Sequence, residues 1–356
     1  MRIVQLIDSL EIGGAERIAV NYANALAERN TFSGIVVTRH EGKLRDHLSK
    51  KLNYLFLKRK RTIDIKAVLR LKTYCKANEV EFIHAHASSF FIAFLLKLLH
   101  PTIKIIWHDH TGARGVQKLA QNKALWFSSR FFSGIIVVNH ALEAWCKRNL
   151  FVKSVLYLPN FTMHVSENQE TKLHGKHNNR ILLLANLRNP KNHSLLIKIA
   201  IRIKESHPQW TFHMIGKDHA DSYSKEIKHD IKINGLEETV YIYGSRTDTA
   251  NIIKQSEICV LTSTSEGLPV SLLEYGLQRK SVVSTEVGEI PSIIKNGING
   301  FTVPNNDVEL FSTALTALMD SIDLRLKIGN ELYNTVMENH SEQVVIEQYL
   351  NWLKAL

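Results

Sequence analysis

The chain has 356 residues, of which 44% are hydrophobic and 22% are charged, and its formal net charge is +11. This composition is that of a globular protein, and the length exceeds what one hydrophobic core usually serves, so two domains are expected. The three scattered cysteines lack metal-ligand spacing and indicate reduced thiols in a cytosolic compartment, which argues against a disulfide-stapled secreted domain.

Short apolar runs alternate with helical segments along the first half of the chain. The alternation predicts a parallel sheet with helices on both faces. Strands are expected at 3–7, 34–38, 82–85, 103–107, 134–138 and 155–158, and helices at 15–29 and 63–77. The most apolar helix candidate, 90–99, is interrupted by Lys97 and is far shorter than the roughly 20 residues that span a bilayer.

A polar stretch without periodicity, 161–179, is interpreted as a linker, and the alternation resumes after it. Strands are expected at 180–185, 210–215, 240–243, 258–261, 281–284 and 301–303, and helices at 308–319, 324–338 and 342–353. The predicted fold is α/β, with two Rossmann-like, doubly wound domains at 1–160 and 180–340 that face each other across a cleft. The closing helix, within 341–356, is expected to pack back on the first domain.

The excess of positive charge lies entirely in the N-terminal half. Residues 1–150 contain 24 Lys and Arg against 11 Asp and Glu, whereas the remainder contains 21 against 23. One dense stretch is Lys50, Lys51, Lys58, Arg59, Lys60, Arg61, Lys66, Arg70, Lys72 and Lys76; a second, Lys118, Lys123 and Arg130, is interleaved with Trp126, Phe127, Phe131 and Phe132. This asymmetry indicates a membrane surface, an acidic acceptor or a nucleic acid as partner, or merely a solvated basic face. No recognition-helix, zinc-finger or RNP-like pattern supports nucleic acid.

Two glutamates eight positions apart, Glu266 and Glu274, flank a strand-to-helix junction that reads Glu-Gly-Leu-Pro-Val-Ser-Leu-Leu-Glu. Pro269 suits the first turn of the following helix, since its missing N–H has no partner there. Free N–H groups at a helix start favour anions and sugar hydroxyls. The junction therefore predicts a ligand site, although a charged turn followed by a solvated helix glutamate is the alternative.

Further polar loops follow predicted strands, where a parallel sheet binds its ligands. Gly13 and Gly14 open the first predicted helix and would let a ligand approach backbone N–H groups. Because they do not form a G-x-G-x-x-G fingerprint, a nicotinamide enzyme is disfavoured.

Histidines follow two neighbouring strands as His84-Ala85-His86 and His108-Asp109-His110. A histidine there could contact a substrate hydroxyl or phosphate, and Asp109 could orient it. A metal site is a weaker hypothesis, because no carboxylates of ligand spacing accompany the histidines.

In the second half, Arg188 and Lys191 lie in a loop after the first strand and could neutralise a leaving diphosphate. A basic surface loop is the alternative. Gly244 and Ser245 follow a later strand and are expected where a base or phosphate passes. No Asp-x-Asp pair, which would hold a divalent ion on a nucleotide diphosphate, occurs in the chain, so a metal-independent reaction without a cofactor is expected.

Together these residues resemble the retaining glycosyltransferases of the GT-B fold, in the large bacterial E-x7-E family (glycosyl transferases group 1, family 4). The similarity covers essentially the whole chain. Its most specific parts are Ser265 to Pro269 with Glu274, Gly13 to Glu16, Lys191, Asn296 to Phe301 and the closing helix with Tyr349 and Leu350.

The resemblance implies that the second domain binds a nucleotide sugar, expected to be a UDP-sugar, and that the first binds the acceptor. Glu274 would hold the ribose, Glu266 would contact the donor sugar, and the backbone of Gly267 and Leu268 would lie near the sugar or phosphate. Lys191 would meet the diphosphate.

It further implies that Gly14 assists Lys191 at the diphosphate. His110 would approach the reacting carbon, with His108 and Asp109 as second choices. The acceptor hydroxyl would attack on the face that the diphosphate leaves, so that configuration is retained.

Two departures from the family pattern concern the diphosphate. Ala185-Asn186-Leu187 stands where the family often has Gly-Arg-Leu, so the usual arginine is absent and Arg188 is the candidate replacement. Pro291-Ser292 stands where Pro-Glu is frequent, with Glu289 two residues before the proline.

The expected acceptor is a hydroxyl of a glycan or lipid-linked sugar in bacterial capsule, O-antigen or exopolysaccharide synthesis. The enzyme is expected in the cytoplasm, peripheral on the anionic inner membrane face through its basic N-terminal domain, with no nucleic-acid partner. Alternatives are another GT-B activity, such as a nucleotide-sugar epimerase or a sugar phosphorylase, and a non-catalytic nucleotide-sugar-binding membrane scaffold.

Overall fold

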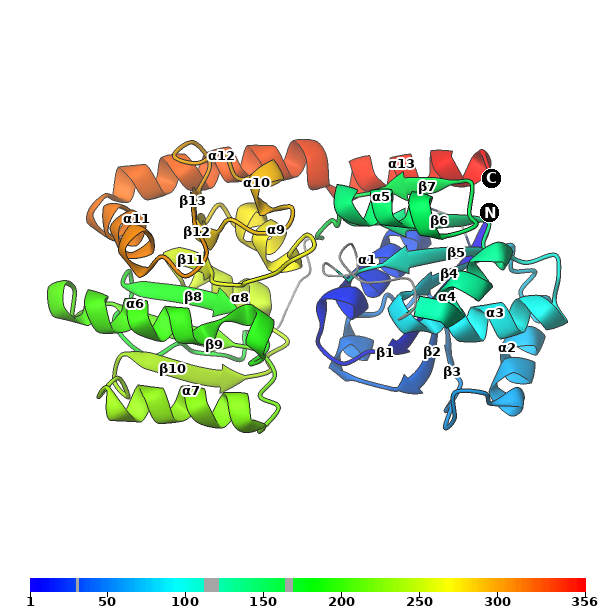
Figure 1. The fold of residues 1–356 in the computed structure, drawn as a ribbon, viewed down its shortest axis with the longest axis horizontal. Coiled ribbons are helices and arrows are strands. Elements are labelled where there is room, and N and C mark those ends of the chain that lie inside the picture. The colour runs from blue at the N-terminus through cyan, green and yellow to red at the C-terminus, as the bar shows by residue number, and fades with distance from the viewer. Residues whose placement is uncertain (30–31, 112–121, 164–168) are drawn as a thin grey trace. The chain divides into compact units, whose positions relative to one another are not determined.

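The computed structural model describes residues 1–29, 32–111, 122–163 and 169–356. The chain forms two compact units (Figure 1). Unit 1 comprises Met1–Met163 and Glu342–Leu356, and unit 2 comprises His164–Ser341. The sequence placed the first domain at 1–160 with 341–356, the linker at 161–179 and the second domain at 180–340.

Unit 1 is built on a parallel sheet that, in the described residues, has seven strands in the order β3-β2-β1-β4-β5-β6-β7. The strands are β1 (Arg2–Ser9), β2 (Phe32–His40), β3 (Asn53–Phe56), β4 (Phe82–His86), β5 (Lys104–Asp109), β6 (Gly134–Val137) and β7 (Val155–Tyr157). The helices are α1 (Gly14–Glu28), α2 (Ile65–Ala77), α3 (Phe90–Leu99), α4 (Lys123–Ser128), α5 (His140–Asn149) and α13 (Glu342–Lys354). Asp64 and Asn139 cap α2 and α5 through their side-chain oxygens, which fixes where these helices begin.

Unit 2 repeats this design with a parallel sheet of six strands, among the residues described, in the order β10-β9-β8-β11-β12-β13. The strands are β8 (Arg180–Leu184), β9 (Thr211–Ile215), β10 (Val240–Gly244), β11 (Ile258–Leu261), β12 (Ser281–Thr285) and β13 (Phe301–Val303). The helices are α6 (His193–Ser206), α7 (Ser222–Ile233), α8 (Thr249–Lys254), α9 (Val270–Leu277), α10 (Ile290–Ile293), α11 (Val308–Asp320) and α12 (Ile322–His340).

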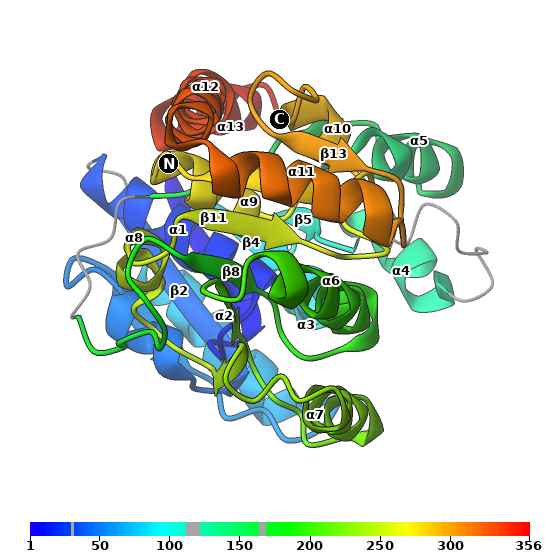
Figure 2. The same cartoon turned by 90° about the vertical axis from the view of Figure 1, so that its left-hand side faces the viewer.

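Helices cover both faces of the unit 2 sheet, as Figure 2 shows from the side. One apolar core joins the sheet to α6, α7 and α11, and a second joins it to α8, α9, α10 and α12. Because both faces are buried, the strands read as continuous apolar runs. The two Rossmann-like sheets confirm the predicted fold class.

The runs predicted as strands all overlap strands of the structure, but β3 (Asn53–Phe56) was not predicted. This short strand lies at the sheet edge beside β2. A further difference concerns Pro269, which is the residue before α9 and not its first turn.

The C-terminal helix α13 belongs to unit 1. Its Tyr349 is fully buried, and its Trp352 donates a hydrogen bond of 2.8 Å to Ser154. A side chain at Gly134, on β6, would lie 2.5 Å from the Trp352 ring, so a glycine allows this close contact between helix and sheet.

Part of the sequence-predicted linker is bound to unit 2. Thr171 donates its backbone N–H and its hydroxyl to the Asp248 carboxylate, at 2.7 Å and 2.8 Å. The Arg180 guanidinium donates to the Leu173 carbonyl at 2.9 Å. Asp248, at the start of α8, and Arg180, on β8, thus anchor this segment to unit 2.

No helix in the described part of the chain is long and apolar enough to cross a membrane. On α2, however, the apolar side chains of Ile65 and Leu69 are 67% and 47% exposed, beside exposed Lys66 and Arg70. The second basic stretch surrounds Arg130, whose guanidinium lies 3.8 Å from the ring centre of half-exposed Phe151. Lys118 of that stretch lies outside the described residues.

Candidate active site

Lys191 and Glu266 meet at the carboxyl ends of β8 and β11. The Lys191 ammonium donates to Glu266 Oε1 at 2.5 Å, and the two side chains are only 18% and 9% exposed. Ser263 donates its hydroxyl to the same carboxylate oxygen at 2.6 Å. A charge-assisted network therefore joins two of the loops that the sequence analysis singled out.

Backbone contacts hold these two loops together. The Thr264 N–H donates to the Pro190 carbonyl at 2.9 Å, and the Thr262 hydroxyl donates to the Lys191 carbonyl at 2.8 Å. Lys191 ends a short 3-10 turn, η6 (Asn189–Lys191), and the next residue, Asn192, has the left-handed φ of 51° that directs the chain into α6. The loop geometry thus places the Lys191 side chain beside Glu266.

The loop of Glu266 also rests on the chain after β12. The Glu289 N–H donates to the Gly267 carbonyl at 2.9 Å. Gly288 has a φ of +57°, and a Cβ there would lie 2.2 Å from the Glu266 carbonyl oxygen. Only glycine satisfies both the backbone conformation and the close approach.

The start of α9 follows directly. No side chain caps it, and the first N–H groups of a helix lack partners within the helix. Leu268 is buried and anchors the junction, while Gly267 and Glu274 are half-buried. The start of α9 therefore offers N–H groups and a partial positive charge beside Glu266.

Arg188 lies on the same loop as Lys191 and is exposed. Within the described residues its guanidinium makes no hydrogen bond or ion pair, so the structure leaves it available. Gly244 is the last residue of β10 and Ser245 follows it; both are half-buried. Gly244 has a φ of +71°, and a Cβ at this position would meet no atom within 4 Å.

Gly216, after β9, brings the loops of three strands together. Its N–H donates to the Gly244 carbonyl at 3.1 Å, and a Cβ at Gly216 would lie 2.1 Å from the Ala185 carbonyl oxygen. Apart from Glu274, which lies within α9, the predicted residues of unit 2 therefore lie at or just beyond the carboxyl ends of its strands.

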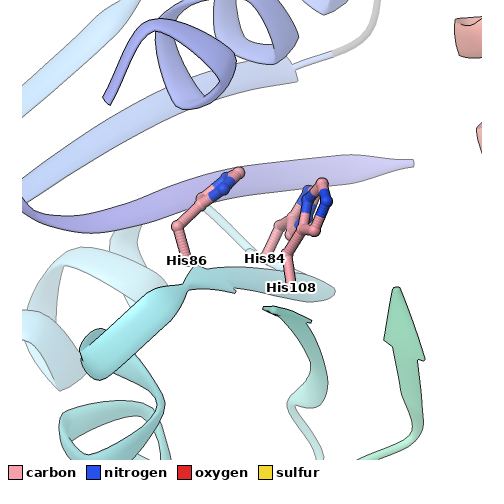
Figure 3. A group of neighbouring side chains, drawn as sticks. All are labelled: His84, His86 and His108. Atoms are coloured by element: carbon pink, nitrogen blue, oxygen red, sulfur yellow. The ribbon is translucent and has the colours of Figure 1, made fainter. Parts of the chain in front are cut away.

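In unit 1, the four histidines form one cluster. His84 and His86 are two residues apart on β4 and therefore point to the same face of the sheet. His108 on β5 is paired with His86, so all three side chains lie on that face (Figure 3). The His108 and His110 rings are stacked with centres 4.0 Å apart. Tyr22 of α1 contacts His84 edge-on, at 4.9 Å between ring centres.

Hydrogen bonds link the rings in two pairs. His84 Nε2 lies 3.1 Å from His108 Nδ1, and the other ring nitrogen of His84 lies 3.1 Å from the Tyr349 hydroxyl of α13. His86 Nδ1 lies 2.9 Å from His110 Nε2, and His86 Nε2 lies 2.8 Å from Gln5 Oε1 of β1.

Burial keeps these rings neutral. It holds the pKa of His84, His86 and His108 well below the usual 6.5, with further lowering from neighbouring histidines, and it lowers the pKa of His110 to about 3. Each imidazole of the cluster consequently has one N–H that can donate a hydrogen bond and one nitrogen that can accept one.

The donor nitrogens of His84, His86 and His108 lie within 4.8 Å of one another, so these three residues could reach one metal ion. Both ring nitrogens of His84 and of His86 already take part in hydrogen bonds, which a metal would have to displace. His108 Nε2, in contrast, is buried and has no hydrogen-bond partner among the described residues. The expectation of a metal-independent reaction remains a prediction.

The structure places the other predicted residues of unit 1 as follows. Asp109 is buried on β5, where neighbouring side chains point to opposite faces of the sheet, so it lies on the other face from His108. Its carboxylate accepts a hydrogen bond from the Thr111 N–H at 3.0 Å. Gly14 is exposed at the start of α1, with no atom within 4 Å of where a Cβ would lie.

Gln5, Ser263 and Gly288 were missed by the sequence analysis. A signal existed for Gln5, because it is a polar residue in the middle of the apolar run of β1 and is fully buried. Ser263 and Gly288 had no distinguishing pattern, since their roles arise from contacts between separate loops.

Two family models match the chain. One, described as Glycosyltransferase Family 4, matches residues 12–162, and the other, described as Glycosyl transferases group 1, matches residues 165–335. The chain belongs to the group 1 glycosyltransferases of the GT-B fold.

Relatives of this glycosyltransferase are distant in sequence. An uncharacterized glycosyltransferase of Haemophilus influenzae is 22% identical, and the match covers 95% of each chain. The UDP-Gal:alpha-D-GlcNAc-diphosphoundecaprenol alpha-1,3-galactosyltransferase of Escherichia coli is 22% identical, over 92% of this chain and 89% of the relative. The poly(ribitol-phosphate) alpha-N-acetylglucosaminyltransferase of Staphylococcus aureus is also 22% identical, but the match spans 49% of its length.

Solved structures share the glycosyltransferase fold. Anabaena HepE, in complex with UDP and glucose, superposes with a TM-score of 0.81 at 15% identity, and both chains are covered completely. S. aureus TarM, in a complex that contains UDP, gives a TM-score of 0.80 at 12% identity, with 99% of each chain covered.

Proposed function

We propose that this glycosyltransferase moves a hexosyl group from a UDP-sugar to a hydroxyl of a lipid-linked or glycan acceptor, with retention of configuration, in bacterial surface polysaccharide synthesis. The observation that carries the proposal is the Lys191–Glu266 pair at the start of α9. A relative whose name specifies a UDP-sugar and a diphosphoundecaprenol acceptor, and fold neighbours solved in complex with UDP, support the choice of substrates.

The donor half of the reaction is assigned to unit 2. The diphosphate would replace Glu266 as the partner of the Lys191 ammonium. It would also contact Arg188, which is exposed on the same loop. Negative charge grows on the diphosphate as the anomeric bond breaks, so these cations lower the barrier. Glu266 would then be released to accept hydrogen bonds from sugar hydroxyls, while Glu274 would hold the ribose.

The acceptor half is assigned to unit 1, with His110 beside the reacting sugar. The acceptor hydroxyl forms the new bond to the anomeric carbon, the bond to the diphosphate breaks, and the hydroxyl proton passes to the leaving diphosphate oxygen. This step requires no metal, because the positive side chains supply the charge.

We assign the basic surface of α2 to an anionic inner membrane surface, on the cytoplasmic side, where a lipid-linked acceptor would be reached. Exposed Ile65 and Leu69 would enter the lipid interface, and Lys66 and Arg70 would meet the headgroups. Apolar side chains flanked by cations are the pattern expected of such a helix.

The test is a product assay with UDP-hexoses and a diphosphoundecaprenol-linked sugar. We expect a glycosylated acceptor whose new anomeric centre keeps the donor's configuration, with turnover unaffected by a metal chelator. A nucleotide sugar converted without any acceptor would instead indicate an epimerase and contradict the proposal.

Glu274→Ala tests the site, with Glu237→Ala as control because that glutamate is exposed elsewhere in unit 2. Loss of the ribose contact should raise the donor KM and reduce kcat/KM by about 100-fold, equivalent to roughly 2.7 kcal/mol. Equal kinetics in the two variants would remove Glu274 from the donor site.

A further inference from the structure

We propose that Gln5 and His86 are positioning residues that fix the proton of His110 on Nε2, so that its Nδ1 accepts a hydrogen bond from a sugar hydroxyl. The proposal deepens the function proposed above and rests on it for the identity of the ligand. It assigns His110 to a hydroxyl group and not to the diphosphate.

The three side chains form a chain of hydrogen bonds that begins inside the sheet of unit 1. Gln5 is fully buried on β1, and its Oε1 lies 2.8 Å from His86 Nε2. His86 is also fully buried, and its Nδ1 lies 2.9 Å from His110 Nε2. His110 follows the last residue of β5 and is half-buried, so it forms the outer end of the chain.

The Gln5 amide oxygen determines which nitrogen donates in each of these hydrogen bonds. An amide oxygen can only accept, so His86 carries its proton on Nε2 and donates it to Gln5 Oε1. A neutral imidazole has one proton, which leaves His86 Nδ1 as an acceptor. His110 must therefore donate from Nε2, and its Nδ1 carries a lone pair.

Neutral rings are required for this argument, and the surroundings provide them. Burial, with the neighbouring His84 and His110, keeps the pKa of His86 well below 6.5, and burial lowers that of His110 to about 3. Near neutral pH each ring thus has one donor and one acceptor nitrogen.

The outer nitrogen selects the ligand group. Among the described residues, His110 Nδ1 has no hydrogen-bond partner. A lone pair accepts from a hydroxyl but is repelled by the oxygens of a diphosphate, which are acceptors themselves. His110 is accordingly suited to a donor-sugar hydroxyl. Gln5 determines this preference through two successive hydrogen bonds, by way of His86.

Nitrogen-15 NMR of histidine-labelled protein tests the proton positions without any substrate. We expect the wild-type spectrum to show His110 protonated on Nε2 and bare on Nδ1. In Gln5→Leu the acceptor is lost, and His110 should populate the opposite tautomer as well. His84→Phe removes an equally buried ring that bonds His108 instead, and it should leave the tautomer of His110 unchanged.

A wild-type His110 protonated on Nδ1 would overturn the proposal, and this measurement needs no variant to fold. An unchanged tautomer in well-folded Gln5→Leu would overturn the role of Gln5. Neither result depends on transferase activity, so the NMR outcome stands even if the proposed reaction is absent.

Kinetics then test whether positioning matters for turnover. His86→Phe should lower kcat by about 100-fold, because a misplaced contact can cost that much, with a smaller change in donor KM. In a His110→Ala background the same substitution should have little further effect. Additive losses would show that His86 acts independently of His110 and would contradict the proposal, whereas no turnover in wild type would contradict the proposed function alone.

Discussion

At the residue scale, Lys191 can serve a diphosphate only after it leaves Glu266, to which it donates at 2.5 Å. We expect Lys191→Ala to reduce kcat by about 100- to 1000-fold, since a preorganised cation facing a developing negative charge contributes that much. Steady-state rates at saturating donor provide the measurement. Lys198→Ala is the matched control, because Lys198 is exposed on the neighbouring helix α6; near-normal turnover in Lys191→Ala would exclude this lysine from the diphosphate site.

The histidine cluster predicts a pH dependence of stability. The folded state keeps the pKa of His84, His86 and His108 well below 6.5, whereas the unfolded chain binds protons near that value. The unfolded state therefore holds more protons below pH 6.5, and the free energy of unfolding must fall as the pH decreases, by about 1.4 kcal/mol per pH unit for each histidine.

Urea unfolding at about pH 7.5 and about pH 5.5 measures this loss. His84→Phe should reduce the dependence of the unfolding free energy on pH by roughly one proton, whatever its effect on stability itself. A pH dependence equal to that of wild type would show that His84 takes up a proton in the folded protein.

At the scale of elements, the sequence predicted strands and helices well because both sheets are buried on both faces, so their strands are continuous apolar runs. It also identified the loops of Lys191 and Glu266 from their position after strands. It did not reveal that these two side chains are paired, nor that Ser263 joins them, because such contacts depend on the relative height of separate loops. The edge strand β3 was missed because edge strands are short and half-exposed, and its apolar signal was weak.

The loop before α9 owes its position to Gly288. Gly288→Ala would require an unfavourable φ of +57° and would push the Glu266 carbonyl from a contact of 2.2 Å. We expect a loss of stability of about 3 kcal/mol together with weaker UDP binding, since the start of α9 moves. Thermal unfolding and calorimetric titration with UDP measure the two effects.

Gly297→Ala is the matched control for Gly288→Ala. Gly297 has a φ of +76°, but no atom lies within 4 Å of a Cβ there, so only the backbone cost of about 1 kcal/mol should appear. Unchanged UDP affinity in both variants would show that Gly288 supports the fold and not the donor loop.

At the scale of the whole molecule, the excess of positive charge lies in the N-terminal half of the sequence. The structure adds that apolar side chains are exposed beside these charges, which a count of charges could not reveal. Ile65 and Leu69 fall in the helix predicted at 63–77, and their spacing of four residues would also suit a buried face. The core of unit 1 instead receives Ala67, Val68, Leu71 and Cys75 from α2, which leaves Ile65 and Leu69 outside. Periodicity alone does not decide which of two apolar stripes packs on a sheet.

These two residues make membrane docking testable with vesicles. We expect binding to vesicles that contain anionic lipid and little binding to zwitterionic ones, with binding reduced when salt is raised from about 0.1 M to about 0.5 M, as screening of headgroup charges requires. The Ile65→Ser and Leu69→Ser double variant should weaken co-sedimentation by about 100-fold, because each of the two buried apolar side chains contributes roughly 1.5 kcal/mol or more. Ile233→Ser is the control, since Ile233 of α7 is 63% exposed but belongs to unit 2 and is not part of the basic stretch of α2. Binding that is indifferent to salt and to anionic lipid would contradict docking through α2, and an equal loss in the Ile233 variant would show that general surface hydrophobicity, not this helix, drives adsorption.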